Sequence, residues 1–340
     1  MKCRYSRSLI TLIALITALL SISGIHAYGA ALFQDEVEEE MTQEEYEAHV
    51  AQTDAYMAAI NEEDPLKRGD MLLEFFDKYP EADLIESHVK PAYTVLMAEC
   101  YQNQKYEALE ILAEKWLKLF PGNKQTISFA ATAAAQLGHN DKYLKYLLVL
   151  YNMEPNAATA RVIAQLYDQQ GDFEKFVEWS EICFQYPEYK VDYTLRYEIL
   201  TKYADAGDVA KATEYARKTL DVLGSAEKPD AAGQKTMQTI RRECNHIIAI
   251  NSYEAGKYQE AITYFDRALK IEKFQDGFYY IGQCYWKLGD PEKAHDYFAA
   301  AEILGGNITA QAKEHKEQLY KALHNDTLIG IEKVHKRAQA

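Results

Sequence analysis

The chain has 340 residues, of which 26% are charged and 48% hydrophobic, an ordinary balance for a protein that folds around an apolar core. Its 16 glycines and 8 prolines amount to about 7% of the residues, against a usual share of roughly 12%, which disfavours turn-rich β-sandwiches and barrels and favours helices. The formal net charge of −15 has the wrong sign for holding phosphate backbones, so nucleic acid is not expected as a partner.

Residues 1–31 have the features of a secretory signal peptide. Three basic residues and no acidic one precede a twelve-residue stretch, 9–20, that is apolar apart from two threonines, and small residues follow it up to Ala31. This stretch is short for a membrane-spanning helix, which needs about 20 residues. We expect cleavage after Ala27 or Ala31 and a mature protein that is periplasmic or secreted and not inserted in the membrane. The alternative is an uncleaved N-terminal anchor.

Removal of residues 1–31 takes away three positive charges and no negative one, which changes the net charge from −15 to −18. The next segment, residues 32–48, contains the run DEVEEE and is interpreted as a solvated acidic leader in front of the first helix. This acidity favours a basic protein surface over nucleic acid or anionic lipid as a partner.

A recurring glycine divides residues 49–308 into helical hairpins. Aliphatic, aromatic and small residues recur at offsets of 3, 4, and 7 or 8 on both sides of this glycine, as expected for two amphipathic helices joined by a tight turn. Glycine can take the left-handed conformation that ends the first helix, and the aspartate that often follows it can cap the second. The recurring glycines are Gly138, Gly171, Gly207, Gly256 and Gly289.

Prolines mark the ends of four second helices, because proline stops one hairpin before the next begins; these are Pro80, Pro121, Pro155 and Pro187. The interval between Gly207 and Gly256 is longer than the others, and the segment 224–236 is interpreted as a loop inserted between two repeats. Residues 309–340 are expected to form a capping helix and a tail. The apolar face predicted for the capping helix carries Ala312, His315, Leu319 and Leu323.

Two segments carry the repeat most clearly, IIAINSYEAGKYQEAITYFDRALKI (247–271) and FYYIGQCYWKLGDPEKAHDYFAAAEIL (278–304). Both resemble the tetratricopeptide repeat (TPR) family in the positions of their small, aromatic and alanine residues. Gln104 stands where the second copy should have its turn glycine, and Leu109 replaces its packing alanine. The resemblance implies an all-α fold, a right-handed α-solenoid of about seven hairpins with a C-terminal capping helix. Five weaker copies begin near His49, Lys90, Lys124, Ala157 and Tyr193.

The search for catalytic and metal-binding patterns gives no candidate. The nine histidines are scattered, and Glu45 with His49 is explained by an i,i+4 contact on a helix face. We therefore expect no enzyme activity, no metal and no cofactor. Cys244 and Cys284 would be offset by roughly 10 Å along neighbouring parallel helices, too far for a disulfide. The sequence thus predicts four buried thiols after the signal peptide, Cys100, Cys183, Cys244 and Cys284.

The family resemblance also implies that the first helices of the hairpins line a concave face that contacts an extended peptide or a partner helix. We expect a non-enzymatic protein–protein interaction scaffold or adaptor of a bacterial-type cell envelope. The alternative is an accessory or substrate-binding subunit for envelope polysaccharide or peptidoglycan enzymes, because aromatic surfaces also stack on sugars. Thr94, Asp168 and His246 share this face with eight candidate partner-binding residues, Tyr101, Arg161, Gln165, Tyr197, Tyr253, Tyr279, Gln283 and Trp286.

Overall fold

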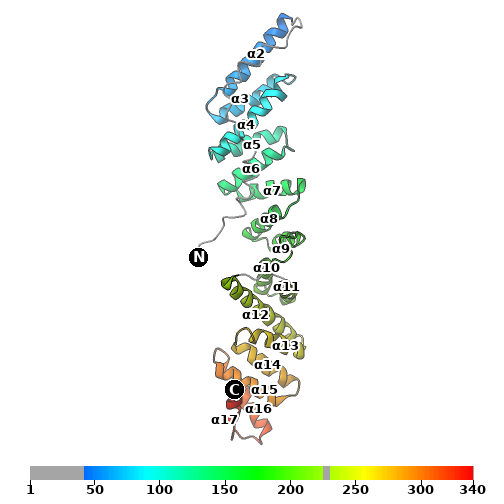
Figure 1. Ribbon diagram of the computed structural model, residues 1–340, viewed down its shortest axis with the longest axis vertical. Helices are drawn as coiled ribbons and strands as arrows, with labels where there is room; N and C mark the ends of the chain where they lie inside the picture. The colour runs from blue at the N-terminus through cyan, green and yellow to red at the C-terminus, as the bar shows by residue number, and fades with distance from the viewer. Residues whose placement is uncertain (1–41, 225–229, 340) are drawn as a thin grey trace. The chain divides into compact units, whose positions relative to one another are not determined.

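The computed structural model describes residues 42–224 and 230–339, and every regular element in these residues is a helix (Figure 1). The chain divides into two compact units, residues 1–179 and 180–340. Within each unit, helices that follow one another along the chain form hairpins, which confirms the predicted all-α solenoid of helical hairpins. No helix in the described part of the chain is both long and apolar enough to cross a bilayer.

The first unit contains three complete hairpins and most of a fourth. Their helices pair in chain order, and a π-helical turn, η3(Ile85–Val89), leads directly into the second hairpin. The pairs are α2(Gln43–Ile60) with α3(Pro65–Lys78), α4(Lys90–Gln102) with α5(Tyr106–Leu119), α6(Lys124–Leu137) with α7(Asn140–Met153), and α8(Ala157–Gln169) with α9(Phe173–Cys183).

The second unit begins within α9 and contains three further hairpins and two C-terminal helices. The predicted repeat starts at Lys90, Lys124, Ala157 and Tyr193 coincide with the first residues of four first helices. The elements of the second unit are α10(Tyr193–Asp205) with α11(Val209–Leu223), α12(Ala231–Glu254) with α13(Tyr258–Leu269), α14(Gln275–Lys287) with α15(Pro291–Leu304), and then α16(Thr309–Leu323) and α17(Glu332–Gln339).

The turns inside the hairpins have the predicted left-handed residue. The five glycines of the sequence series have φ between 71° and 78°. The backbone N–H of the following residue donates to the carbonyl five positions earlier, as in the bond from Asp290 N to Tyr285 O (2.9 Å), which closes the first helix in a Schellman-type motif. Asp208 and Asp290 then cap the second helices, each by accepting from a backbone N–H three residues on.

Stacked aromatic rings and close approaches at small residues both contribute to the packing of the hairpins. Trp116 stacks on Tyr93 with ring centroids 4.3 Å apart. In the second unit a side chain at Gly282 would meet the Phe298 ring at 2.9 Å, so α14 and α15 approach closely only because this position is glycine. The amphipathic pattern of each hairpin is therefore satisfied by its neighbours in the same unit.

The predicted acidic leader, residues 32–48, is wrong at its C-terminal end, where α2 begins at Gln43. The side chain of Thr42 accepts the backbone N–H of Glu45, and the Glu45 carboxylate accepts the backbone N–H of Thr42 at 2.8 Å. This capping box starts the helix six residues before the predicted repeat start at His49. The rest of the leader and the signal peptide, residues 1–31, lie outside the described residues.

The loop predicted at 224–236 is also wrong in its second half, because residues 231–236 are the first turns of α12. Asp230 caps this helix by accepting the backbone N–H of Gly233 at 2.8 Å. Ile240 and Cys244 are buried along it, so packing stabilises a first helix of 24 residues. Residues 225–229 lie outside the described residues.

The capping helix α16 begins at Thr309 as predicted, but it is rotated slightly from the predicted face. Ala312 and Leu319 are buried, whereas Leu323 is 43% exposed and Lys316 is buried in its place. The predicted tail contains α17, whose Val334 packs among buried residues of α15 and α16. Residues 332–339 are therefore a second capping helix.

The cysteines after the signal peptide are buried, as predicted. Burial raises the pKa of the Cys244 and Cys284 thiols to about 12, and it also raises the pKa of Cys100. Cys183 is buried as well, and Cys3 lies outside the described residues. Thiols in such surroundings are chemically inert in the folded protein.

Candidate functional site

Two first helices of the second unit, α12 and α14, and the capping helix α16 line a groove of about 460 Å³. Because α12 and α14 are the first helices of successive hairpins, the groove includes part of the face that the sequence predicts for partner binding. Its lining residues are Tyr253, Asp276, Tyr279, Tyr280, Gln283, Ile308, Gln311 and His315.

Tyrosine rings form the apolar part of the groove. The Tyr253 and Tyr280 rings meet edge to face with centroids 5.1 Å apart, and Tyr280 meets Tyr279 in the same way at 5.6 Å. The Tyr279 ring in turn stacks on the His315 imidazole of α16 at 5.6 Å. The rings thus form one continuous series from α12 through α14 to α16, which gives rigid contact area with polar tips.

A hydrogen-bond network around His315 holds the α16 side of the groove. The Gln283 amide Nε2 lies 2.8 Å from His315 Nδ1 and donates to the Tyr279 hydroxyl at 3.0 Å, and that hydroxyl lies 3.2 Å from the same Nδ1. Since both neighbours can donate to Nδ1, the neutral imidazole carries its proton on Nε2. Burial lowers the pKa of His315, so the ring is neutral at pH 7.

The groove carries a net negative charge at neutral pH. Asp276, exposed in the first turn of α14, is its only formally charged lining residue. Glu314 on α16 lies close enough to help raise the pKa of Tyr279, although burial of the phenol is the larger cause. None of the eight lining residues is lysine or arginine.

The structure brings together four of the eight predicted partner-binding residues. Tyr253, Tyr279 and Gln283 line the groove, and the Trp286 ring lies 5.4 Å from the His315 ring and is 38% exposed. Tyr279 and Gln283 are only 7% and 8% exposed, because α16 docks against them. They shape the wall of the groove and present little surface.

The other four candidates do not join this cluster. Tyr197 on α10 donates its hydroxyl proton to the Glu243 carboxylate of α12. Tyr101, Arg161 and Gln165 belong to the first unit, where each is half-buried; the Tyr101 ring packs 6.1 Å from Phe129. None of these four lines the groove of the second unit.

Sequence reasoning did not propose five of the groove residues as a binding site. Asp276 and Tyr280 lie close to predicted positions on the same helix. They would have been predicted if more positions on that side of the helix had been counted as partner-binding. Ile308, Gln311 and His315 come from the capping helix and the loop before it, and His315 was predicted only as a packing residue. The sequence analysis could not assign these three residues to the groove, because their place depends on where α16 docks.

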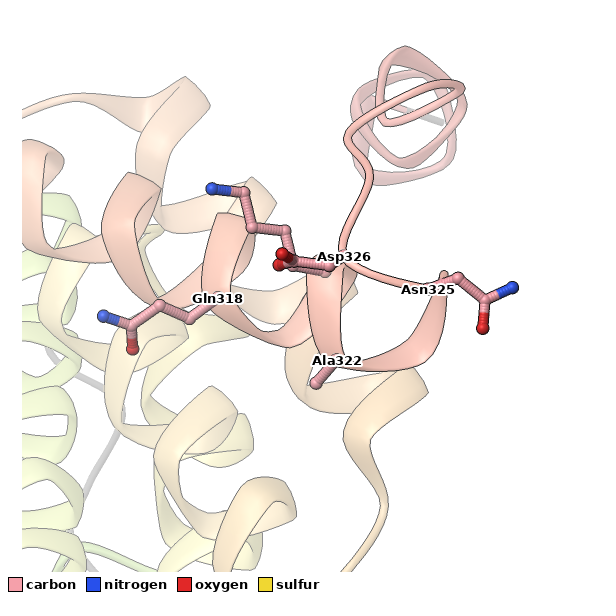
Figure 2. A pocket seen from close by; sticks show the side chains of 5 residues that line it. Gln318, Ala322, Asn325 and Asp326 are labelled. Carbon is pink, nitrogen blue, oxygen red and sulfur yellow. The ribbon is translucent and has the colours of Figure 1, made fainter.

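A second hollow, of about 550 Å³, lies at the C-terminal end of α16 and is lined by Gln318, Lys321, Ala322, Asn325 and Asp326. Figure 2 shows Gln318 and Asn325 pointing away from each other, with Ala322 between them on the helix. Its side chains do not converge on a common point, so it is a surface depression and not a second candidate site. The described residues also contain no group of three or more His, Cys, Asp or Glu placed to hold a metal ion.

Residues 276–302 match the family model described as tetratricopeptide repeat. The matched segment is most of the α14–α15 hairpin with its left-handed turn at Gly289. The other hairpins of the described residues repeat the same arrangement of two helices and a tight turn. The α14–α15 segment is therefore similar to a tetratricopeptide repeat, and the fold of the described residues is an all-α array of such hairpins.

Comparison with curated proteins gives no match to this chain. Among solved structures, it is similar to a tetratricopeptide repeat protein from Parabacteroides merdae, at 15% identity over 81% of this chain and 99% of that chain, with a TM-score of 0.30. It is similar to PilF of Pseudomonas aeruginosa at 14% identity over 66% of this chain and 96% of that chain, with a TM-score of 0.34. A third likeness is to the Naa15/Naa10 structure bound to HypK-THB, at 15% identity over 82% of this chain and 43% of that chain, with a TM-score of 0.45.

Proposed function

We propose that this protein is a non-enzymatic scaffold that binds a segment of a protein partner in the groove lined by α12, α14 and α16. The observation that carries the proposal is the groove itself, where successive first helices place three tyrosine rings and a neutral histidine along one surface. A tyrosine side chain buries a large surface area on binding and loses little conformational entropy, and tyrosine is enriched at the hot spots of protein interfaces. Concave faces of helical repeats bind extended segments in this way.

The non-enzymatic part of the proposal rests on the class of protein. Tetratricopeptide repeats serve in general as scaffolds for protein–protein interaction. The groove also lacks an activated nucleophile, because its only histidine accepts at Nδ1 from an amide and a phenol and contacts no serine or cysteine among the described residues.

The proposed place of action is the cell envelope, in the periplasm or outside the cell. The support for this is the N-terminal sequence, in which a basic start, a short apolar stretch and small residues follow one another within residues 1–31. The partner would then be another exported protein or the exposed part of an envelope protein.

Site-specific photo-crosslinking tests the proposed binding site. A benzophenone amino acid replaces Tyr253 or Trp286 in the full chain, expressed in its native cell. The matched control replaces Ile303 on α15, which is 40% exposed against 38% for Trp286 but stands on a second helix. We expect the two groove positions to capture the same protein and the control position to leave it uncaptured.

We expect the captured protein, once purified, to bind the chain in solution. Tyr280→Ala should lower the affinity of this binding at least tenfold. Capture that is equal at Ile303, or binding that Tyr280→Ala leaves unchanged, would contradict the proposal. Micromolar binding of purified envelope glycans that Tyr280→Ala abolishes, with no protein captured, would replace it with the alternative of an accessory subunit for polysaccharide or peptidoglycan enzymes.

A further inference from the structure

The charge of the groove restricts the chemistry of its occupant. Asp276 is exposed and makes no ion pair within the described residues, so its carboxylate remains available to a ligand. The nearby cation of α12, Arg242, is already shared between Glu243 and Glu272, at 3.3 Å from each. Glu314 adds a second carboxylate at the α16 side. A negatively charged segment would be repelled here, and the net charge of −15 on the whole chain attracts a cation.

The rings beside Asp276 offer the second half of a cation site. The Tyr253–Tyr280 and Tyr280–Tyr279 pairs have interplanar angles of 66° and 79°. One face of Tyr280 is covered by the Phe265 ring, 5.7 Å away and nearly parallel, and Tyr279 stacks on His315. Tyr253 is half-buried and stacks face to face on no other ring of the described residues. A cation binds over such a ring face within about 6 Å of the centroid. The neutral His315 adds no positive charge that would oppose this.

A guanidinium group can contact the Asp276 carboxylate and a tyrosine ring at the same time. It is planar, so it stacks on a tyrosine ring, and its fork of N–H donors matches a carboxylate in a bidentate contact. The hydroxyls of Tyr253 and Tyr280 and the carbonyl of the exposed Gln311 side chain provide further acceptors on the same surface. A lysine ammonium is a strongly hydrated point charge, so it can pair with the carboxylate but cannot stack on a ring as a planar group does.

We infer that the groove recognises an arginine side chain of the partner segment, held between the Asp276 carboxylate and the tyrosine rings of α12 and α14. This inference rests on the proposed function and names the chemistry of its partner. An acidic segment, a lysine in place of the arginine, and a neutral glycan are the occupants it excludes.

Titration of the purified full chain with matched peptides tests the inference. The peptides are acetylated Gly-Ser sequences of nine residues with a central arginine, citrulline, lysine or glutamate, and binding is followed by NMR shifts of the protein. Citrulline keeps the shape of arginine without its charge. We expect the arginine peptide to bind at least tenfold more tightly than each of the other three.

Asp276→Asn is expected to lower the affinity for the arginine peptide at least tenfold. Glu292→Gln, which removes one charge from an exposed position of α15 outside the groove, should change it by less than twofold. Equal binding of the citrulline or the lysine peptide, or an affinity that Asp276→Asn leaves unchanged, would overturn the inference.

The photo-crosslinking experiment separates this inference from the proposed function. A partner that is captured at Tyr253 and binds Asp276→Asn as tightly as the natural chain would leave the scaffold function in place and overturn the arginine assignment. Equal capture at Ile303 overturns the proposed function, and the inference fails with it.

Discussion

At the residue scale, the turn in each hairpin from the second to the seventh imposes one demanding backbone position, a residue with positive φ. Five hairpins meet it with glycine, and the second hairpin meets it with Gln104, whose φ is 56°. The same helix-closing bond forms there, from Lys105 N to Cys100 O at 2.8 Å. The left-handed conformation is unfavourable for a residue with a Cβ, so the α4–α5 turn carries a local cost that the other turns avoid.

Gln104→Gly should therefore stabilise the protein, by about 0.5–1 kcal/mol, because the relief of strain exceeds the extra entropy of glycine in the unfolded chain. The matched control is Gln102→Gly, two residues earlier in α4, which should destabilise by a similar amount. Urea unfolding followed by circular dichroism measures both changes. A lower midpoint for Gln104→Gly would contradict the account of this turn.

A buried histidine makes the second unit sensitive to acid. His295 on α15 is 2% exposed, and its Nε2 has no hydrogen-bond partner among the described residues. Burial lowers its pKa from 6.5 to about 4; Asp296 opposes this shift, whereas Arg337, Lys316 and His324 add to it. The unfolded chain thus binds a proton more readily than the folded chain between these two values. The stability linked to His295 is complete above pH 6.5 and is lost as the pH falls toward 4.

We expect the loss from this residue to reach about 2 kcal/mol between pH 7.5 and pH 4.5. His295→Gln should remove most of it, whereas His49→Gln, a matched change on α2 of the first unit, should not. Urea midpoints at the two pH values measure the difference. If His295→Gln loses as much stability on acidification as the natural chain, burial of the imidazole is not the cause.

Part of the site could be predicted residue by residue. Tyr253 and Trp286 follow from the repeat register, because each stands at a first-helix position and remains partly exposed although its ring also contacts the second helix of its own hairpin. The burial of Tyr279 and Gln283 could not be predicted, since it depends on where α16 docks, and the hydrophobic period of α16 does not encode that position.

At the scale of elements, the two C-terminal helices are joined by a buried ionic cluster. Lys316 of α16, 3% exposed, pairs with Glu302 of α15 and contacts His335 of α17. His335 Nε2 lies 3.1 Å from the same Glu302 carboxylate. Together with the apolar contacts of Val334, this cluster fixes α17 on the last hairpin.

Lys316→Met should destabilise the second unit by about 3 kcal/mol, because it leaves the Glu302 carboxylate partly buried without its main partner. The double variant Lys316→Met with Glu302→Leu should recover most of this loss, since no buried charge then remains. Thermal unfolding of the two variants measures the difference. A double variant no more stable than the single one would show that lost packing, and not the unpaired charge, dominates.

Most elements were predictable from periodicity and turn chemistry, and the exceptions have local causes. The proline series correctly marks the ends of α3, α5, α7 and α9, each of which stops between two and four residues before its proline. The first turns of α12, residues 231–236, were missed because Gly224, Pro229 and Gly233 suggest a loop, whereas the Asp230 cap and the burial of Ile240 stabilise a helix. The early start of α2 depends in the same way on the cap at Thr42.

At the scale of the whole molecule, the order of hairpins within each unit follows from the sequence because each hairpin buries its apolar face on its neighbours along the chain in that unit. Contacts between residues far apart in the sequence play little part in such an array, so its fold can be predicted from a single sequence. The cellular location of the protein is an expectation that rests on residues 1–31. The partner is not encoded in the repeat pattern and depends on the side chains that the groove collects.

If the N-terminal segment directs export, the mature chain should begin at Tyr28 or Leu32 and migrate with the soluble fraction of the envelope. Intact mass spectrometry of protein purified from its native cell measures this directly. A chain that retains Met1 and stays in the membrane fraction would instead support the uncleaved anchor.

The central claim is that the groove lined by α12, α14 and α16 is the binding surface, and the His315 ring is its most direct reporter. This imidazole contacts Tyr279, Gln283 and Trp286, so a ligand in the groove must change its surroundings. Side-chain NMR of histidine-labelled protein is recorded while the captured partner is added. We predict that the His315 signals shift in step with binding while those of His49 stay constant. Saturated binding with unchanged His315 signals would contradict the account.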